Sequence, residues 1–329
     1  MTAAKRQPRS FQPVSSGAFL VVGLAAALAT ALTAPQASAA TAAATQAVIN
    51  RDFPDPSVYS TLFGNYAYST NSRYDGTVRN IPVATSSGLH GPWRSAGDAL
   101  PNPGSWVGGP RAVWAPDVSR RADGEYLMYY AANHKRLHRH CVGAAVASNP
   151  AGPFRPTGAP VVCGANSRDD IDPAAFVDDS GNRYLLYVSF PRGSGSVIWL
   201  QRMNDAGTGV ISGRTALLRA SRQDEGGIVE APTLVERGSG YVLLYSANGY
   251  NSGRYFVNYA RSNRIAGPYS KAGGALLSTQ TSGLANPGGQ SVVRGLLGDH
   301  LVFHAGVPSG RGMFVARLGW QDGNPVVGF

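Results

Sequence analysis

Four acidic residues of this 329-residue sequence stand beside prolines in short motifs that recur along the chain. The motifs are Phe53-Pro54-Asp55-Pro56-Ser57-Val58, Trp114-Ala115-Pro116-Asp117-Val118, Ile171-Asp172-Pro173-Ala174 and Val229-Glu230-Ala231-Pro232-Thr233. A single Asp-Pro pair usually marks a turn. Several carboxyl groups held together instead raise one another's pKa, which costs stability and is usually kept for function. Paired carboxyl groups suit acetal hydrolysis, because one donates a proton and the other activates water.

The elements that would gather these acids belong to a repeat. Five apolar segments, aligned on Ser69, Tyr130, Val188, Tyr245 and His304, are separated by 61, 58, 57 and 59 residues. Gly-Pro-aromatic turns follow a later strand in three repeats, at 91–93, 152–154 and 267–269. Each repeat holds about four short strands, which predicts an all-β fold, a five-bladed β-propeller with four-stranded blades around a central channel. The alternative is a β-sandwich with chance similarity between segments.

The acids fall at similar places in four repeats, 14, 13, 16 and 15 residues before the alignment residue. In a propeller the innermost strands of all blades run in the same direction along the channel. We therefore expect four carboxyl groups to meet at one end of the channel.

The N-terminus has the three parts of a secretory signal peptide. A basic start with Lys5, Arg6 and Arg9 precedes an apolar run at 18–32, and small residues at 37–40 suit cleavage. We expect a signal peptide at 1–40, a flexible leader at 41–47 and the propeller at 48–329, in a secreted protein. The alternative is an uncleaved membrane anchor. An oxidising compartment favours a disulfide between Cys141 and Cys163 over two free thiols.

Composition excludes a disordered chain, since 43% of residues are hydrophobic and 15% are charged. The formal charge of +10 falls to about +7 without the three basic residues of the signal peptide. Arginines are scattered and no basic helix is evident, so acidic cell-wall material suits the charge better than nucleic acid does. We expect a monomer that binds neither nucleic acid nor, after signal cleavage, a membrane.

The order of the motifs resembles glycoside hydrolase family 43, including Asp178-Asp179-Ser180-Gly181 after the third acid. Members of that family are five-bladed propellers that act on plant polysaccharides containing arabinose and xylose. The resemblance implies that Asp55 is the general base and Glu230 the general acid. It implies that Asp172 orients the acid and raises its pKa, that Asp117 is structural, and that hydrolysis inverts the anomeric configuration. An inverting pair should lie about 6.5–9.5 Å apart.

The resemblance also concerns the channel. His304 matches a histidine that in many relatives faces a water or a metal ion. We therefore expect Ca²⁺ near His304 and no other cofactor. The alternative is a core histidine whose hydrogen bonds are made within the protein. Many relatives have Gly-Pro-Gly-His before the fifth blade, whereas this chain has Asn286-Pro287-Gly288-Gly289. Gly289 in place of the histidine puts the details of a metal site in doubt.

Aromatic side chains near the motifs could stack on sugar rings or could serve packing. The candidates for substrate binding are Phe53, Trp114, Phe190 and Tyr250, with Trp106 nearby. A run at 134–140 contains three histidines. We expect a solvated loop at the channel rim there rather than a zinc site, because no cysteine or acid accompanies the histidines usefully.

The leading hypothesis is an inverting glycosidase acting on α-L-arabinofuranosyl linkages of a plant cell-wall polysaccharide or oligosaccharide, in arabinan or arabinoxylan. The sequence ends at Phe329 directly after the fifth repeat. Relatives that are β-xylosidases commonly carry a further C-terminal β-sandwich, so a β-xylosidase is the second choice. A non-catalytic carbohydrate-binding propeller is the alternative of another class, but it would lack one carboxylate.

Overall fold

The computed structural model describes residues 46–74, 76–109, 112–295 and 298–329. The expected signal peptide and nearly all of the expected leader lie outside these residues. The described residues belong to one compact unit. No helix in this part of the chain is long and apolar enough to cross a membrane.

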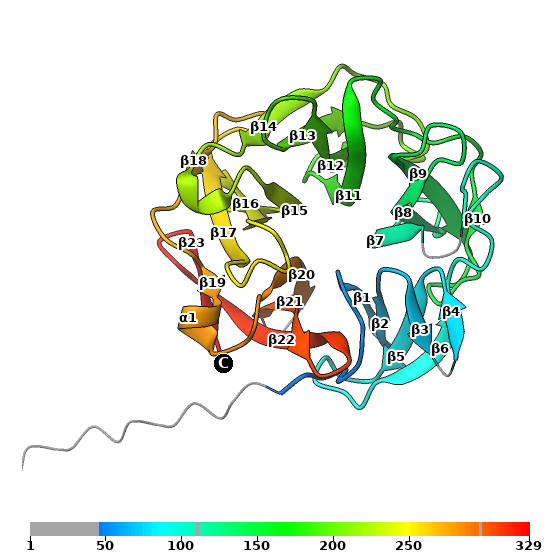
Figure 1. Ribbon diagram of the computed structural model, residues 1–329, viewed down its shortest axis with the longest axis horizontal. Coiled ribbons are helices and arrows are strands. Elements are labelled where there is room, and N and C mark those ends of the chain that lie inside the picture. The colour runs from blue at the N-terminus through cyan, green and yellow to red at the C-terminus, as the bar shows by residue number, and fades with distance from the viewer. Residues whose placement is uncertain (1–45, 75, 110–111, 296–297) are drawn as a thin grey trace, which may run out of the picture. The chain divides into compact units, whose positions relative to one another are not determined.

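Five antiparallel sheets surround a central opening, so the predicted five-bladed propeller is confirmed (Figure 1). The first blade contains β1 (Ser57–Thr61), β2 (Gly64–Tyr68), β5 (Pro82–Ser86) and β6 (Arg94–Asp98), with β3 (Ser72–Tyr74) and β4 (Thr77–Arg79) as an inserted hairpin. The second contains β7 (Val113–Arg120), β8 (Tyr126–Asn133), β9 (His140–Ala147) and β10 (Arg155–Pro156). The third contains β11 (Ser167–Val177), β12 (Arg183–Pro191), β13 (Val197–Arg202) and β14 (Thr215–Arg219).

The last two blades follow the same order. The fourth contains β15 (Val229–Arg237), β16 (Gly240–Ala247), β17 (Phe256–Ser262) and β18 (Ser270–Lys271), with β19 (Leu277–Ser278) added beside β17. The fifth contains β20 (Gly288–Gly295), β21 (Gly298–Val307), β22 (Gly310–Gln321) and β23 (Asn324–Gly328). The short helices are η1 (Gln223–Glu225) and α1 (Thr279–Ser282).

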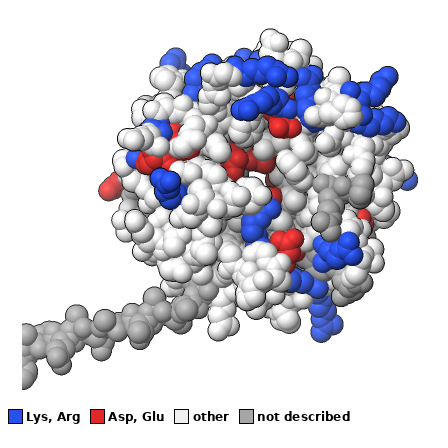
Figure 2. Space-filling model, in the orientation of Figure 1, with Lys and Arg blue, Asp and Glu red and all other residues white. Residues whose placement is uncertain are grey.

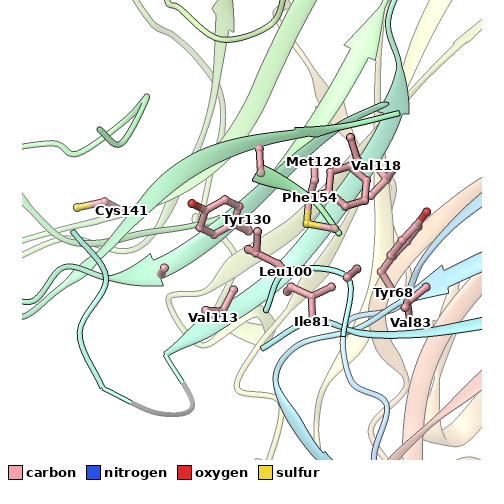
Figure 3. Close-up of a cluster of buried hydrophobic side chains, with 14 of the residues drawn as sticks. Tyr68, Ile81, Val83, Leu100, Val113, Val118, Met128, Tyr130, Cys141 and Phe154 are labelled. Atoms are coloured by element: carbon pink, nitrogen blue, oxygen red, sulfur yellow. The ribbon is translucent and has the colours of Figure 1, made fainter. Parts of the chain in front are cut away.

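The core lies between neighbouring sheets. The second strand of each blade is the repeated apolar segment, and it is buried on both faces because the blade is packed between two others. Figure 3 shows Tyr68 and Ile81 of the first blade meeting Met128 and Phe154 of the second. Burial of each large apolar side chain contributes about 1.5–3 kcal/mol, and this packing sets the spacing of the strands that line the channel.

A disulfide joins Cys141 of β9 to Cys163, as predicted. The bond links the second blade to the segment that leads into β11 of the third. In the chain-entropy model, the 22-residue separation between the cysteines corresponds to a stabilisation of about 3 kcal/mol.

Four of the five innermost strands, β7, β11, β15 and β20, bend at a bulge near the end where the acids lie. The pairing register shifts between Trp114 and Asp117 and at the equivalent places in β11, β15 and β20. One residue of each innermost segment has left-handed backbone angles, with φ of 51° at Asp55, 44° at Ala115, 51° at Asp172, 49° at Ala231 and 58° at Gly289. Such bulges redirect side chains at the rim of a sheet.

The bulges correct the expectation that four carboxyl groups occupy matching positions. Asp55 and Asp172 are themselves the left-handed residues, whereas Glu230 comes one residue before its bulge residue, Ala231. Asp117 comes two residues after Ala115, further along the channel. A shift of one residue changes the direction in which a strand side chain points, so three of the four acids remain candidates for one site.

The two ends of the described chain meet at a seam between the first and fifth blades. The N–H of Val48 donates to the carbonyl of Met313 at 2.8 Å, and the N–H of Met313 donates to the carbonyl of Ile49 at 3.1 Å. The N–H of Phe53 donates to the carbonyl of Arg311. Residues 48–53 therefore lie along β22 and lead directly into the Asp55 motif.

Candidate active site

The bulges surround the mouth of the channel. Asp55, Asp172 and Asp117 line a narrow cavity of about 50 Å³, together with residues of all five innermost strands. Figure 2 shows acidic side chains around the central opening, with basic side chains next to them. The cavity therefore runs from Asp55 and Asp172 at the mouth to Asp117 further along the channel, and it holds their carboxyl groups in a confined space.

Asp55 is held by groups that favour its ionised form. One carboxylate oxygen accepts a hydrogen bond of 2.6 Å from Thr70, and the other lies 3.2 Å from Nη1 of Arg311 and 3.2 Å from Nδ1 of His304. Burial raises the pKa of Asp55, but the Arg311 cation, together with the Thr70 hydrogen bond, outweighs burial and holds it well below its usual value. Asp55 is an ionised carboxylate over the whole neutral range.

Glu230 is held in the opposite state. Burial raises its pKa, the negative charge of Asp172 raises it further, and Asp55 adds to the effect, whereas the Tyr255 hydroxyl and Arg311 oppose it. The Tyr255 hydroxyl donates a hydrogen bond of 2.7 Å to Oε1 of Glu230. The result is a carboxyl group that keeps its proton near neutral pH.

Asp172 interacts electrostatically with both of these acids. One of its oxygens accepts a hydrogen bond of 2.9 Å from the N–H of Ala231, next to Glu230. Burial and then the charge of Asp55 raise the pKa of Asp172. Because Asp172 interacts electrostatically with both other acids, the three groups form one titrating system.

A buried ion pair fixes the loop that leads to Glu230. The side chain of Glu225 is 1% exposed, and Nζ of Lys271 donates to its two oxygens at 2.6 and 2.8 Å. The N–H groups of Ser221 and Arg222 also donate to Glu225. With its charge paired and its oxygens bonded, Glu225 anchors the segment 221–228.

Sequence reasoning missed three residues that contact the acids, namely Thr70, Tyr255 and Arg311. A signal for Thr70 existed, because Thr70, Ser189 and Ser246 each follow the alignment residue of their repeat and all three are buried. Thr70 accepts from the N–H of Ala115 in the next blade, and Ser246 accepts likewise from Gly289. Tyr255 and Arg311 lie outside every repeated motif.

Two consecutive glycines make room for this arrangement. A Cβ atom on Gly288 would lie 2.0 Å from the ring of Tyr255. A Cβ atom on Gly289 would lie 2.4 Å from the ring of His304 and 2.9 Å from the Asp55 carboxylate. Gly289, which has no side chain, therefore lets His304 pack directly against Asp55.

The residues near His304 do not fit a calcium site. The N–H of Asp55 donates to Nδ1 of His304 at 3.1 Å, and the Asp55 oxygen next to that nitrogen already faces the Arg311 cation. Calcium requires six to eight oxygen ligands. Within the described residues, no group of three or more His, Cys, Asp or Glu side chains could hold a metal ion. We derive no step through a metal.

The aromatic candidates separate into three kinds. Phe53 is 1% exposed and Trp106 is 7% exposed, so both serve packing, and the expectation that Phe53 binds sugar is corrected. Phe190 is partly buried against the core of the third and fourth blades. Trp114 is partly exposed, whereas Tyr250 is 52% exposed with the Arg311 guanidinium 4.8 Å from its ring centre. Phe190, Trp114 and Tyr250 stay candidates for sugar contact.

The histidine run at 134–140 is only partly the solvated loop that we expected. Lys135 to His138 are exposed, but His140 is buried in β9. The His140 ring stacks on Trp114 with ring centres 3.6 Å apart, and Nδ1 lies 2.9 Å from the Asp169 carboxylate. The buried His140 therefore covers one face of the Trp114 ring and fixes its orientation.

Asp117 bridges three blades inside the channel. Its oxygens accept from the Ser57 hydroxyl at 3.3 Å and from the N–H of Ala175 at 2.7 Å. Burial raises its pKa to about 6, against the effect of these two hydrogen bonds and of Arg183. Its contacts agree with the structural role that the resemblance implies.

A five-bladed propeller whose channel mouth carries one ionised and one protonated carboxyl group defines a glycosidase that hydrolyses O-glycosyl bonds. The sequence profile of "Glycosyl hydrolases family 43" matches residues 44–325. The chain belongs to this family of enzymes, as its motifs predict.

Individual relatives agree with this assignment. The chain is 30% identical over 232 residues to extracellular endo-α-(1→5)-L-arabinanase 1 of Bacillus subtilis strain 168, covering 64% of this chain and 68% of the relative. It is 26% identical over 303 residues to a probable arabinan endo-1,5-α-L-arabinosidase C of Aspergillus flavus, covering 83% and 90%. A crystal structure of a thermostable family-43 glycoside hydrolase superposes with a TM-score of 0.73 at 24% identity, over 84% of this chain and 92% of the other, and shows the same fold.

Proposed function

We propose that this enzyme hydrolyses α-L-arabinofuranosyl linkages in arabinan, with inversion of configuration. The observation that carries the proposal is the contrast in surroundings at one channel mouth: Asp55 lies beside the Arg311 cation, whereas Glu230 is buried near Asp172, so the two carboxyl groups favour opposite protonation states. Two relatives from different kingdoms are named for action on arabinan. A relative named xylosidase/arabinosidase 43A, from Humicola insolens, matches only 25% of this chain, so the longer matches favour arabinan over a β-xylosidase. A non-catalytic binding propeller would have no use for carboxyl groups held in opposite states.

Each acid has one role in this mechanism. The protonated Glu230 donates its proton to the oxygen of the leaving sugar as the glycosidic bond breaks. The ionised Asp55 removes a proton from a water molecule that attacks the anomeric carbon from the opposite face. Single displacement by water inverts the configuration, and we expect the two carboxyl groups to be about 6.5–9.5 Å apart.

The neighbours keep the two acids in these states. Arg311 lies beside the Asp55 carboxylate and stabilises its charge. The charge of Asp172 disfavours ionisation of Glu230 before the proton is used. Tyr255 fixes the direction of the Glu230 carboxyl group through its hydrogen bond.

We further propose that the protein is exported and acts outside the cell. The basic and apolar N-terminal segment at 1–40 and the disulfide support export. The relative from Bacillus subtilis is named as an extracellular enzyme.

The test is hydrolysis of linear arabinan followed by proton NMR. We expect arabinose or arabino-oligosaccharides to form, with the β-anomer appearing first and then mutarotating. A ladder of oligosaccharides would indicate internal cleavage, and arabinose alone would indicate cleavage from an end. Release of xylose from xylosides with no action on arabinan, or first formation of the α-anomer, would contradict the proposal.

A further inference from the structure

A group of basic side chains lies on the same face of the propeller as the channel mouth. We call it the basic rim and define it by Lys135, Arg136, Arg139, Arg168 and Arg192. These residues lie in the connections β8–β9 and β12–β13 and at the start of β11. Figure 2 shows basic side chains gathered over the second and third blades, whereas acidic ones surround the central opening.

The segments that carry the basic rim are held together. Nη1 of Arg139 donates to the carbonyls of Ala165 and Ser167 at 3.0 and 3.1 Å, which fixes the 134–140 loop against the start of β11. Arg168 and Arg192 line one cavity of about 590 Å³ with the turn Gly193-Ser194-Gly195. This hollow is wide open to solvent, so a group bound there would lie on the surface between the two arginines.

The acids near the basic rim offset only part of its charge, since Arg168 interacts with the neighbouring Asp169. The segments 134–140, 164–170 and 190–195 contain two acidic residues, Asp169 and Asp170. Asp169 accepts hydrogen bonds from the backbone and the ring of His140. Asp170 is fully buried and accepts from Ser189 and from the N–H of Gly164. Arg192 and Arg136 have no ion pair to an acid within the described residues.

A short series of contacts connects the basic rim to the proposed general base. Thr70 bonds both Asp55 and the N–H of Ala115, and Trp114 precedes Ala115. The Trp114 ring stacks on His140, which bonds the Asp169 carboxylate, and Arg168 precedes Asp169. A polymer bound at the mouth and extending past Trp114 would therefore cross the basic rim.

We propose that the basic rim binds carboxylate groups of uronic acid residues carried by the polysaccharide whose neutral arabinosyl part enters the channel. The proposal rests on the proposed function for the neutral part and extends it to a charged part of the substrate. Arginine pairs bidentately with planar carboxylates, and four of the five side chains of the rim are arginines. Carboxylates are chosen over the phosphates of a nucleic acid because the rim continues from a mouth that cleaves polysaccharide.

The experiment compares the wild type with the double variant Arg168→Gln/Arg192→Gln and with a control of equal charge, Arg264→Gln/Arg317→Gln, which changes exposed residues of the fourth and fifth blades. Binding to polygalacturonate, to neutral linear arabinan and to double-stranded DNA is measured at low and at high salt. Polygalacturonate contains no arabinose, so its binding is independent of whether the enzyme cleaves arabinan.

We expect the first double variant to raise the Kd for polygalacturonate about three- to ten-fold at low salt, the usual effect of losing two exposed ion pairs. The effect should shrink at about 0.5 M salt through screening. The Kd and the rate on neutral arabinan should not change, and the control should behave as the wild type. Equal loss in both double variants, an equal loss on neutral arabinan, or tighter binding to DNA than to polygalacturonate would overturn the proposal.

Discussion

The hydroxyl of Tyr255 donates to Oε1 of Glu230 at 2.7 Å, while the Tyr255 ring lies 5.8 Å from the ring of His304 and nearly parallel to it. His304 in turn contacts Asp55. Tyr255 thus contacts the proposed acid directly and the proposed base through His304. The two carboxyl groups belong to different blades.

Tyr255→Phe removes the hydroxyl that lowers the pKa of Glu230. We expect the alkaline limb of the rate profile to move to higher pH, because Glu230 then keeps its proton longer. The loss of orientation should lower kcat on arabinan by about ten-fold, since a hydrogen bond to a catalytic group contributes roughly 1.5 kcal/mol. Tyr129→Phe, which removes a buried hydroxyl bonded to Gly207, is the control. An unmoved alkaline limb would count against this role.

Asp172→Asn should move the alkaline limb in the opposite direction. Burial keeps the pKa of Glu230 raised, but the variant removes the negative charge that is the second cause of the rise. Glu230 should therefore lose its proton at a lower pH. The decline of the rate on the alkaline side should begin at a lower pH than in the wild type. The measurement is kcat/KM against pH on arabinan, with Asp205→Asn, an exposed position, as the control. A shift to higher pH would refute the assignment.

Glu230→Gln should abolish proton donation to the leaving oxygen. We expect a loss of about 10²- to 10⁴-fold on arabinan and a much smaller loss on nitrophenyl arabinofuranoside, whose leaving group needs little acid assistance. Glu236→Gln, at the other end of β15, provides a matched control. Equal losses on both substrates would show that Glu230 is not the acid.

Asp55→Asn should impair both substrates to the same degree, by about 10²- to 10⁴-fold, because each requires an activated water. Asparagine keeps the size of the side chain, but its single oxygen can accept from only one of Thr70 and Arg311. Azide should not yield a product of retained configuration, since no covalent intermediate is involved. Full activity of this variant on arabinan would disprove the mechanism.

Asp117→Asn tests the cost of a buried channel carboxyl group. The folded pKa of Asp117 is raised from 3.8 to about 6, so its favourable contribution to stability is complete below pH 3.8 and is lost as the pH rises through 6. We expect the variant to have a higher Tm than the wild type at pH 7 and a similar Tm near pH 4, measured by calorimetry. Asp205→Asn should follow the wild type throughout. A Tm difference that does not depend on pH would contradict this account.

The sequence predicted the propeller because every blade repeats the same apolar second strand, and the Asp-Pro and Ala-Pro motifs pointed to the three acids at the mouth. It did not reveal the register of the bulges. Asp172 is itself a bulge residue, Glu230 comes one residue before the bulge residue of its strand, and Asp117 comes two residues after that of its strand. Arg311 could not be predicted, because it is 256 residues from Asp55 in the sequence and belongs to no repeated motif. Phe53 lies in a motif, yet its ring is buried against the seam.

The seam between residues 48–53 and β22 has a consequence for the order in which activity arises. A chain shorter than 304 residues already contains Asp55, Asp172 and Glu230, but it lacks both His304 and Arg311. The carboxylate of Asp55 then has no cation to hold it, and its strand has no β22 to lie against. The fifth blade therefore completes the surroundings of the general base, and we expect a chain that lacks this blade to be inactive although it contains all three acids.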